Sequence, residues 1–255
     1  MIIDANVHAT RDGGWFGTGH DASLSRLLAE LDRAGVGRAV LTGLAGACPT
    51  EDVLALCREA GGRLLPVGAF DPAAHDSPEA VRRAARDELA GRGLLGVKLH
   101  PRLGRYDVLD DRVLALLDEL AGWDERLGVW ICTILHVPGL RLRRAPVEAL
   151  CELVGRTPEL PFVLVHGGGA DLLRLATAVR SASNALLDLS YTVTHLGGSS
   201  VGADLAHLLE TFDERLVFGS DFPESDISAA LEHLAAPPNV LGGNLARVFE
   251  LAAVT

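Results

Sequence analysis

The sequence has few of the features that mark secreted or membrane-bound proteins. Its four cysteines, Cys48, Cys57, Cys132 and Cys151, form no CxxC pair, which favours reduced structural thiols. Nowhere do about 18 apolar residues follow one another, and no basic segment precedes an apolar one at the N-terminus. Neither a membrane span nor a signal peptide is therefore indicated, and we expect a cytoplasmic protein.

Basic residues are also scarce. The chain of 255 residues has 23 Lys and Arg against 34 Asp and Glu, a formal net charge of −11, which argues against a nucleic-acid or anionic-membrane partner. Lys98 is the only lysine. The composition, 48% hydrophobic and 22% charged, excludes a disordered or collagen-like chain and provides enough apolar residues for a sizeable core. A small-molecule substrate is the expected partner.

Short apolar runs alternate with stretches of helical spacing from one end of the chain to the other. Leucines at positions 24, 27, 28 and 31 predict a helix with one buried face, and residues 113–120 repeat that pattern. The runs predict eight strands: Ile2–Val7, Arg38–Gly43, Leu64–Phe70, Leu94–Leu99, Gly128–Leu135, Phe162–Val165, Ala185–Leu189 and Leu216–Gly219.

Eight strand-then-helix units without a long linker predict a single-domain α/β protein, a (β/α)8 TIM barrel over residues 1–255. A doubly wound open sheet is the alternative. Such a sheet usually has a glycine-rich phosphate turn after its first strand, whereas this chain continues there with Asn6-Val7-His8. The cluster Gly167–Gly169 does not have the GxGxxG spacing, so it does not indicate a nucleotide site.

Polar residues gather where the predicted strands end, which is where a barrel carries its active site. These ends comprise Asp4 to His8, Lys98 to His100, His136, His166, Asp188 to Ser190, and Ser220 to Asp221. Residues two apart on a strand share a face, so Asp4, Asn6 and His8 are expected to project the same way. Their convergence on one mouth indicates a metal site or an acid–base site.

Imidazoles with a carboxylate suit Zn²⁺ or a similar divalent ion, which would acidify a bound water into a hydroxide nucleophile. A single strand-end histidine is more often structural, and Asp221 has the alternative role of capping the helix after Pro223. The set as a whole favours function, because buried ionisable groups cost free energy unless they are paired or bound to metal. Five other histidines are assigned no functional role: His20, His75, His195, His207 and His233.

Several motifs resemble one known family. The matching segments are IDANVH, GVKLHP, the strand end at His136, VHGGG, LDLS, FGSDFP and LGGNLARVFEL. In this order they resemble the amidohydrolase superfamily, in the branch of metal-dependent hydrolases and decarboxylases related to aminocarboxymuconate semialdehyde decarboxylase. The resemblance covers essentially the whole chain. It implies a barrel enzyme acting on a small molecule, and pairing into a homodimer.

The resemblance also implies roles for individual residues. His8, His136 and Asp221 would be metal ligands; His166 would activate water or substrate, with Asp221 sharing the proton transfer. Asn6 stands where the family usually has the first histidine of His-x-His, and an amide oxygen is a poorer zinc ligand than imidazole. In order of preference, the site binds a divalent metal weakly or selects a harder ion, works as a metal-free lactonase, or has lost catalysis.

Four residues are candidates for substrate binding: Lys98, His100, Trp15 and Arg141. Relatives of the superfamily that carbamylate a strand-four lysine offer a second reading of Lys98, but this branch generally does not. The loop Arg11–Gly17 provides aromatic area beside glycines, and the arginines after His136 would suit a carboxylate. A solvated basic loop is the alternative.

Two functions follow from these expectations. The first is hydrolysis of an amide, ester or lactone, or decarboxylation of a small carboxylic acid, by an enzyme centred on His8, His136, His166 and Asp221. The second is a catalytically silent barrel that binds a small molecule or a partner enzyme, for which Asn6 is the reason.

Overall fold

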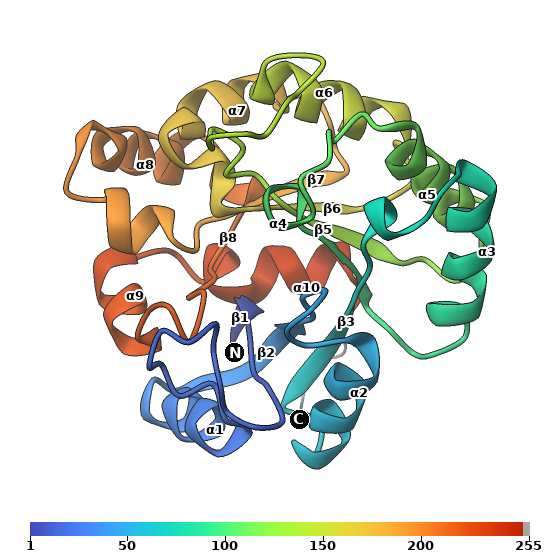
Figure 1. Cartoon of the computed structure of the whole chain (residues 1–255). Helices are drawn as coiled ribbons and strands as arrows, with labels where there is room; N and C mark the ends of the chain where they lie inside the picture. Colours follow the sequence, from blue (N-terminus) through green and yellow to red (C-terminus); the bar gives the residue numbers. More distant parts are fainter. Residues whose placement is uncertain (252–255) are drawn as a thin grey trace.

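The computed structural model describes residues 1–251 and contains one eight-stranded parallel sheet in the order β1 to β8. Figure 1 shows the strands at the centre with the helices around them. The strands are β1 (Ile2–Val7), β2 (Val36–Thr42), β3 (Leu64–Ala69), β4 (Gly96–Leu99), β5 (Gly128–Cys132), β6 (Phe162–Val165), β7 (Ala185–Asp188) and β8 (Leu216–Val217). The predicted (β/α)8 barrel is confirmed, with strand ends moved by up to three residues.

The helices follow the strands in the expected alternation. They are α1 (Leu24–Arg33), α2 (Thr50–Glu59), α3 (Pro78–Glu88), α4 (Pro101–Gly104), α5 (Asp111–Ala121), α6 (Pro146–Arg156), α7 (Leu172–Ala178), α8 (Ser200–Thr211), α9 (Ile227–Leu234) and α10 (Asn244–Val248). Ser23 caps α1 by accepting a hydrogen bond from Arg26 N, and the helix buries Leu27 and Leu31. Within residues 1–251, every helix is too short or too polar to cross a bilayer.

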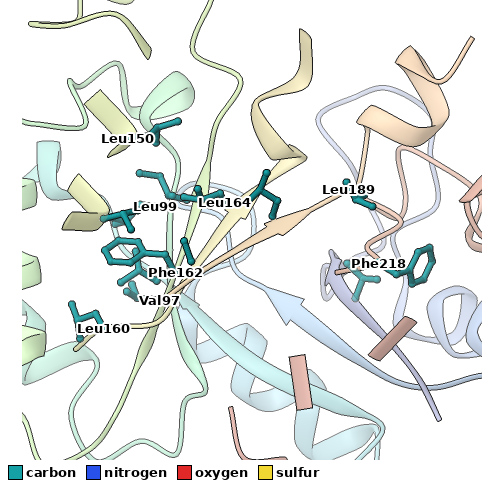
Figure 2. Packing of buried hydrophobic residues seen from close by; sticks show 14 of the residues in the cluster. Val97, Leu99, Leu150, Leu160, Phe162, Leu164, Leu189 and Phe218 are labelled. Atoms are coloured by element: carbon teal, nitrogen blue, oxygen red, sulfur yellow. The ribbon is translucent and has the colours of Figure 1, made fainter. Parts of the chain in front are cut away.

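Most of the apolar core lies between the strands and the surrounding helices. Alternate residues of a strand face opposite sides, so Val97 and Leu99 of β4 pack outward with Phe162 and Leu164 of β6, together with Leu150 of α6. Figure 2 shows this layer. All five side chains are buried.

A second, smaller core fills the inside of the barrel. Trp130 of β5 lies there in one cluster with Val163 and Leu186, and its ring packs against Phe249 with the centroids 4.8 Å apart. A Cβ atom at Gly96 would overlap the indole, so glycine in β4 makes room for it. α10 contributes Leu245 and Val248 to this interior core. The barrel interior is thus closed by apolar side chains at the end opposite the polar strand ends.

The sheet closes through the chain that follows β8. Ala5 N donates to Phe218 O (2.8 Å), Asp221 N to Asn6 O (3.0 Å) and His8 N to Phe222 O (2.8 Å). These hydrogen bonds place the end of β1 beside the segment after β8. Asn6, His8 and Asp221, which are 215 residues apart in sequence at the most, therefore become neighbours.

Candidate active site

A cavity of about 290 Å³ lies at the carboxyl ends of the strands. Its walls come from β4, from α4 and from the segments that follow β1, β2, β5, β6, β7 and β8. It is lined by His8, Trp15, Phe16, Leu44, Lys98, His100, Arg102, Leu103, Ile134, His166, Tyr191, His195, Asp221 and Glu224. The volume suits a small molecule.

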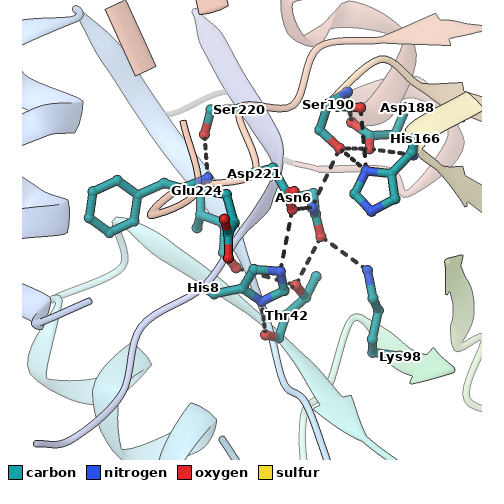
Figure 3. A network of polar contacts seen from close by, with 12 residues as sticks. Asn6, His8, Thr42, Lys98, His166, Asp188, Ser190, Ser220, Asp221 and Glu224 are labelled. Atoms are coloured by element: carbon teal, nitrogen blue, oxygen red, sulfur yellow. Dashed lines mark hydrogen bonds and ion pairs between the residues drawn. The ribbon is translucent and has the colours of Figure 1, made fainter. Parts of the chain in front are cut away.

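Asn6 forms the centre of the polar network at this end of the barrel (Figure 3). Its Oδ1 accepts hydrogen bonds from Lys98 Nζ (3.2 Å) and Thr42 Oγ1 (3.0 Å), and its Nδ2 donates to Asp221 Oδ1 (2.8 Å). An ammonium can only donate and a carboxylate can only accept, so these partners determine which way the amide faces. Asn6 thus links the only lysine to the Asp221 carboxylate.

His8 and Asp221 form a close pair on the same side of the cavity. The His8 ring hydrogen bonds to Thr42 O through Nδ1 (2.9 Å), which leaves Nε2 facing Asp221 Oδ1 at 3.5 Å. Trp15 stacks on His8 with the ring centroids 5.0 Å apart, and its Nε1 donates to Glu224 Oε1 (2.5 Å). The loop after β1 therefore covers the pair and shields it from water.

A relay from β7 holds His166 in place. Ser190 Oγ donates to Asp188 Oδ2, and His166 Nδ1 lies 3.0 Å from Ser190 Oγ and 3.3 Å from Ser190 O. With its one proton given to Asp188, the hydroxyl accepts from Nδ1, so the neutral ring carries its proton on Nδ1 and its lone pair on Nε2. A Cβ at Gly219 would overlap the Asp188 carboxylate, so glycine after β8 permits this close approach.

The pKa values of the buried groups are shifted in different directions. Burial lowers the pKa of His166 to about 4, so the imidazole is neutral at neutral pH. Burial raises the pKa of Asp221, but His166, the hydrogen bond with His8 and Lys98 outweigh it, so the pKa of Asp221 lies below its usual range. Burial raises the pKa of Asp188 to about 6. An ionised carboxylate and a neutral imidazole therefore face the same cavity, and both can accept a hydrogen bond or a proton.

Residues of β4 and α4, together with His100 between them, add hydrogen-bond donors to the cavity. Leu103 N donates to His100 Nδ1 (3.3 Å), so the proton of the neutral ring is on Nε2. Burial, with Lys98 and Arg102 nearby, lowers the pKa of His100 far below its usual range. Lys98 and Arg102 line the same cavity. A substrate oxygen with negative charge would be bound by these donors.

Several cavity residues adopt backbone conformations that side chains rarely adopt. Phe16, His166, Tyr191 and Asp221 have φ values of 46°, 71°, 61° and 63°. Such conformations cost about 1–3 kcal/mol each and occur preferentially at functional sites. The glycines after His166 allow its strained turn: Gly167 has a φ of 56°, where a Cβ would press on Asp188 O. This concentration around one cavity supports a functional role for it.

The structure brings most of the predicted site residues together. Asn6, which is fully buried beneath the cavity, joins residues that line it: His8, Trp15, Lys98, His100, His166 and Asp221. His136 and Arg141 do not join them. β5 ends at Cys132, three residues before the predicted end, and the chain then leaves the barrel. His136 is 66% exposed, with its Nε2 2.7 Å from Asp171 Oδ2, and Arg141 is exposed outside the cavity.

The sequence analysis missed other residues of the site. Thr42 and Glu224 received no role, and His195 was treated as structural although it lines the cavity and stacks on Tyr191 at 4.3 Å. The position of Thr42 at the end of β2 was an available signal, since neighbouring strand ends carried the other candidates. His195 offered none, because it lies in an irregular turn over residues 192–196.

The family model for amidohydrolases (Amidohydro_2) matches residues 3–241. This chain belongs to the amidohydrolase family. No curated protein matches the chain. The resemblance stated from the motifs is therefore confirmed at the level of the family.

Solved structures with low sequence identity share the amidohydrolase fold of this chain. An uncharacterised TIM-barrel protein from Bordetella bronchiseptica is 19% identical, with a TM-score of 0.79 and 98% of each chain covered. A probable 2-pyrone-4,6-dicarboxylic acid hydrolase from Acinetobacter baumannii with bound citric acid is 16% identical, with a TM-score of 0.66 and coverage of 98% and 99%. A 5-carboxyvanillate decarboxylase from Novosphingobium aromaticivorans in complex with manganese is 15% identical, with a TM-score of 0.70 and coverage of 98% and 96%.

The donor set of this amidohydrolase does not fit a resident divalent metal in the arrangement described. Over residues 1–251, no three His, Cys, Asp or Glu side chains are grouped so that they could hold an ion. Of the four predicted ligands, only His8 with Nε2 and Asp221 with Oδ1 turn toward each other atoms that could bind a metal. The Asn6 oxygen is engaged by Lys98 and Thr42, and its NH2 group faces Asp221. His136 lies outside the cavity, because the chain turns away after β5.

Proposed function

We propose that this amidohydrolase hydrolyses a small ester, lactone or amide that carries a carboxylate. One observation carries the proposal: the ionised Asp221 and the neutral His166 line the same cavity as the donors Lys98, His100 and Arg102. An acyl-transfer reaction needs a base on one side of the carbonyl and donors for its developing negative oxygen on the other. The cavity has both kinds of group.

The donors would orient the substrate. Arg102 is exposed at the mouth, where a guanidinium can hold a carboxylate by two hydrogen bonds. Lys98 is buried deeper, beside the N–H of His100 Nε2, and these donors suit the scissile carbonyl oxygen. A substrate bound in this way presents its carbonyl carbon toward Asp221.

The base would activate water. Asp221 takes a proton from a water molecule whose oxygen attacks the carbonyl carbon, and the carbonyl oxygen gains the negative charge. When the bond from carbon to the leaving oxygen or nitrogen breaks, Asp221 returns that proton to the leaving group. His166 orients the water by accepting its second hydrogen at Nε2, since its Nδ1 is held by Ser190. Trp15 excludes other water from the His8–Asp221 pair.

A matched substrate screen tests the proposal. Lactones, esters and anilides of about 8–14 non-hydrogen atoms are offered in pairs, one with a carboxylate and one with its methyl ester or amide. We expect turnover of at least one carboxylate member and a much lower kcat/KM for its neutral partner. The same screen records CO2 release, because structural neighbours include a decarboxylase.

Two variants assign the turnover to this site. Asp221→Asn keeps the size of the side chain but removes the base, and general-base removal typically costs 10²–10⁴-fold in rate. Asp124→Asn, at an exposed position, removes the same charge elsewhere and should leave kcat/KM unchanged. Full activity in Asp221→Asn, or turnover limited to decarboxylation, would contradict the proposal.

A further inference from the structure

Lys98 is placed unusually for a cation. It is the only lysine of the chain, it lies on β4 inside the barrel, and it is 3% exposed. Its Nζ hydrogen bonds to a neutral amide oxygen, Asn6 Oδ1, and to no carboxylate within residues 1–251. A buried ammonium held in this way costs free energy, so its retention in the site calls for a functional explanation.

Asn6 couples this cation to the base. Because its oxygen accepts from Lys98 and its NH2 donates to Asp221, the amide transmits the polarisation of the ammonium to the carboxylate across two hydrogen bonds. Lys98 itself also contributes to keeping Asp221 ionised. Lys98 and Asn6 together therefore supply a positive charge near Asp221. A metal ion in a hydrolase site has the same function, among others.

The same two residues disfavour a metal ion at this position. A divalent cation beside His8 and Asp221 would meet the NH2 face of Asn6, which offers no lone pair, and the charge of Lys98 close behind it. In a buried site, like charges repel strongly at short range because little solvent screens them. Turning the amide over would give the ion an oxygen but would leave Lys98 facing an NH2 group, donor against donor.

We infer that Lys98, held by Asn6, replaces the divalent ion: the pair excludes a metal and provides the fixed positive charge of the site. In the hydrolysis proposed above, on which the catalytic half of this inference rests, Lys98 donates a hydrogen bond to the carbonyl oxygen as it becomes negative. Lys98 keeps its proton and forms no covalent bond. The metal-excluding half does not depend on any reaction.

Metal binding is measured first, without a substrate. The chelator-treated protein, freed of chelator, is titrated with Mn²⁺ and with Zn²⁺ by calorimetry, and the retained metal is counted by mass spectrometry. The variants are Asn6→His, Lys98→Met and the double variant. We expect no stoichiometric binding by the wild type, weak binding by Asn6→His, and about one equivalent in the double variant. There the introduced imidazole would join His8 and Asp221 without a neighbouring charge.

Each result decides the inference. One equivalent of metal in the wild type that is lost in Asp221→Asn would overturn it. A double variant that is folded by circular dichroism but binds no metal would also overturn it, because the pair would then not be what excludes the ion. The wild-type titration stands even if the double variant does not fold.

Activity separates this inference from the proposed function. With a substrate from the screen, we expect EDTA to leave kcat/KM unchanged and Lys98→Met to lower kcat by about 10²–10³-fold, as for other oxyanion donors. Hydrolysis that needs added Mn²⁺ would overturn the inference and leave the function intact. A wild type that excludes metal but turns over nothing in the screen would contradict the proposed function and leave the metal-excluding half of the inference intact.

Discussion

The two ends of the barrel interior differ in what fills them. At the closed end, Trp130 packs in an apolar core with Leu245 and Val248 of α10. At the open end, Lys98, Asp221 and His166 lie buried in one hydrogen-bonded network. Burial of apolar area at the closed end stabilises the folded state, whereas burial of charge at the open end destabilises it. The difference indicates that stability and chemistry are assigned to opposite ends of the same eight strands.

The largest effect is expected at the closed end. Trp130→Ala removes a fully buried ring and its hydrogen bond to Ala5 O (2.9 Å), and such truncations cost about 3–5 kcal/mol of unfolding free energy. Urea denaturation measures this loss. At a temperature where the variant is still folded, kcat/KM should change little, because Trp130 does not line the cavity. Trp130→Phe, which keeps most of the ring, is the matched control and should lose much less stability.

A marked fall in kcat/KM, measured where Trp130→Ala is fully folded, would contradict the separation of the two ends. So would a destabilisation below about 1 kcal/mol, since it would mean that the interior core carries little of the folding free energy.

The boundary between the two ends is tested by Asp4. This carboxyl group is fully buried in β1. Its Oδ1 accepts from Asn6 N (3.1 Å) and Ser220 N (3.0 Å), while its Oδ2 has no hydrogen-bond partner among the residues that the structure describes. Burial raises the pKa of Asp4 to about 7. The folded state therefore binds a proton that the unfolded state releases above pH 4, so the stability from this group falls as the pH rises toward 7.

Asp4→Asn removes that titration and keeps an oxygen for both backbone donors. The stability of the variant relative to wild type should rise by about 1.4 kcal/mol for each pH unit between 5 and 7 and then level off. Urea denaturation at pH 5, 6, 7 and 8 measures the difference, in which the other titrating groups cancel. If the difference in unfolding free energy did not change with pH, Asp4 would be ionised throughout this range. Asp4 would then belong to the charged open end of the barrel.

The sequence predicts regular structure and its consequences better than it predicts loops. The eight strands follow from their apolar runs, and Asn6, Lys98 and Asp221 converge because each lies at the carboxyl end of a strand in a closed barrel. His136 was misplaced because the apolar run of β5 continues to Leu135, although the strand ends at Cys132. Pairing with β6 stops at Cys132, and a run of apolar residues in the sequence does not indicate where the neighbouring strand ends.

The role of Asn6 also lay beyond the sequence. Its position two residues before His8 suggested a weakened metal ligand, but which way its amide faces depends on Lys98 and Asp221, 92 and 215 residues away. Similarly, His195 reaches the cavity through the irregular turn after β7, whose conformation is set by tertiary packing.

The smallest effect is expected from the relay that holds His166. Ser190→Ala removes the hydroxyl between Asp188 and His166 Nδ1, but Ser190 O, 3.3 Å from Nδ1, remains as an acceptor. The ring should therefore keep its tautomer and lose only part of its orientation. We expect kcat to fall about tenfold, equivalent to about 1.4 kcal/mol, with KM nearly unchanged, because Ser190 does not line the cavity.

Steady-state kinetics on the screened substrate give both constants, and His166→Asn provides the reference for complete loss of the imidazole. If Ser190 acted only by supporting the fold, the apparent kcat would fall in proportion to the fraction of folded protein, the stability would fall with it, and lowering the temperature would restore the rate. If instead Ser190→Ala matched His166→Asn, the hydroxyl and not the backbone carbonyl would determine the tautomer. A tenfold effect on kcat alone, in a variant of unchanged stability, would show that the open end of the barrel tunes chemistry at little cost to the closed end.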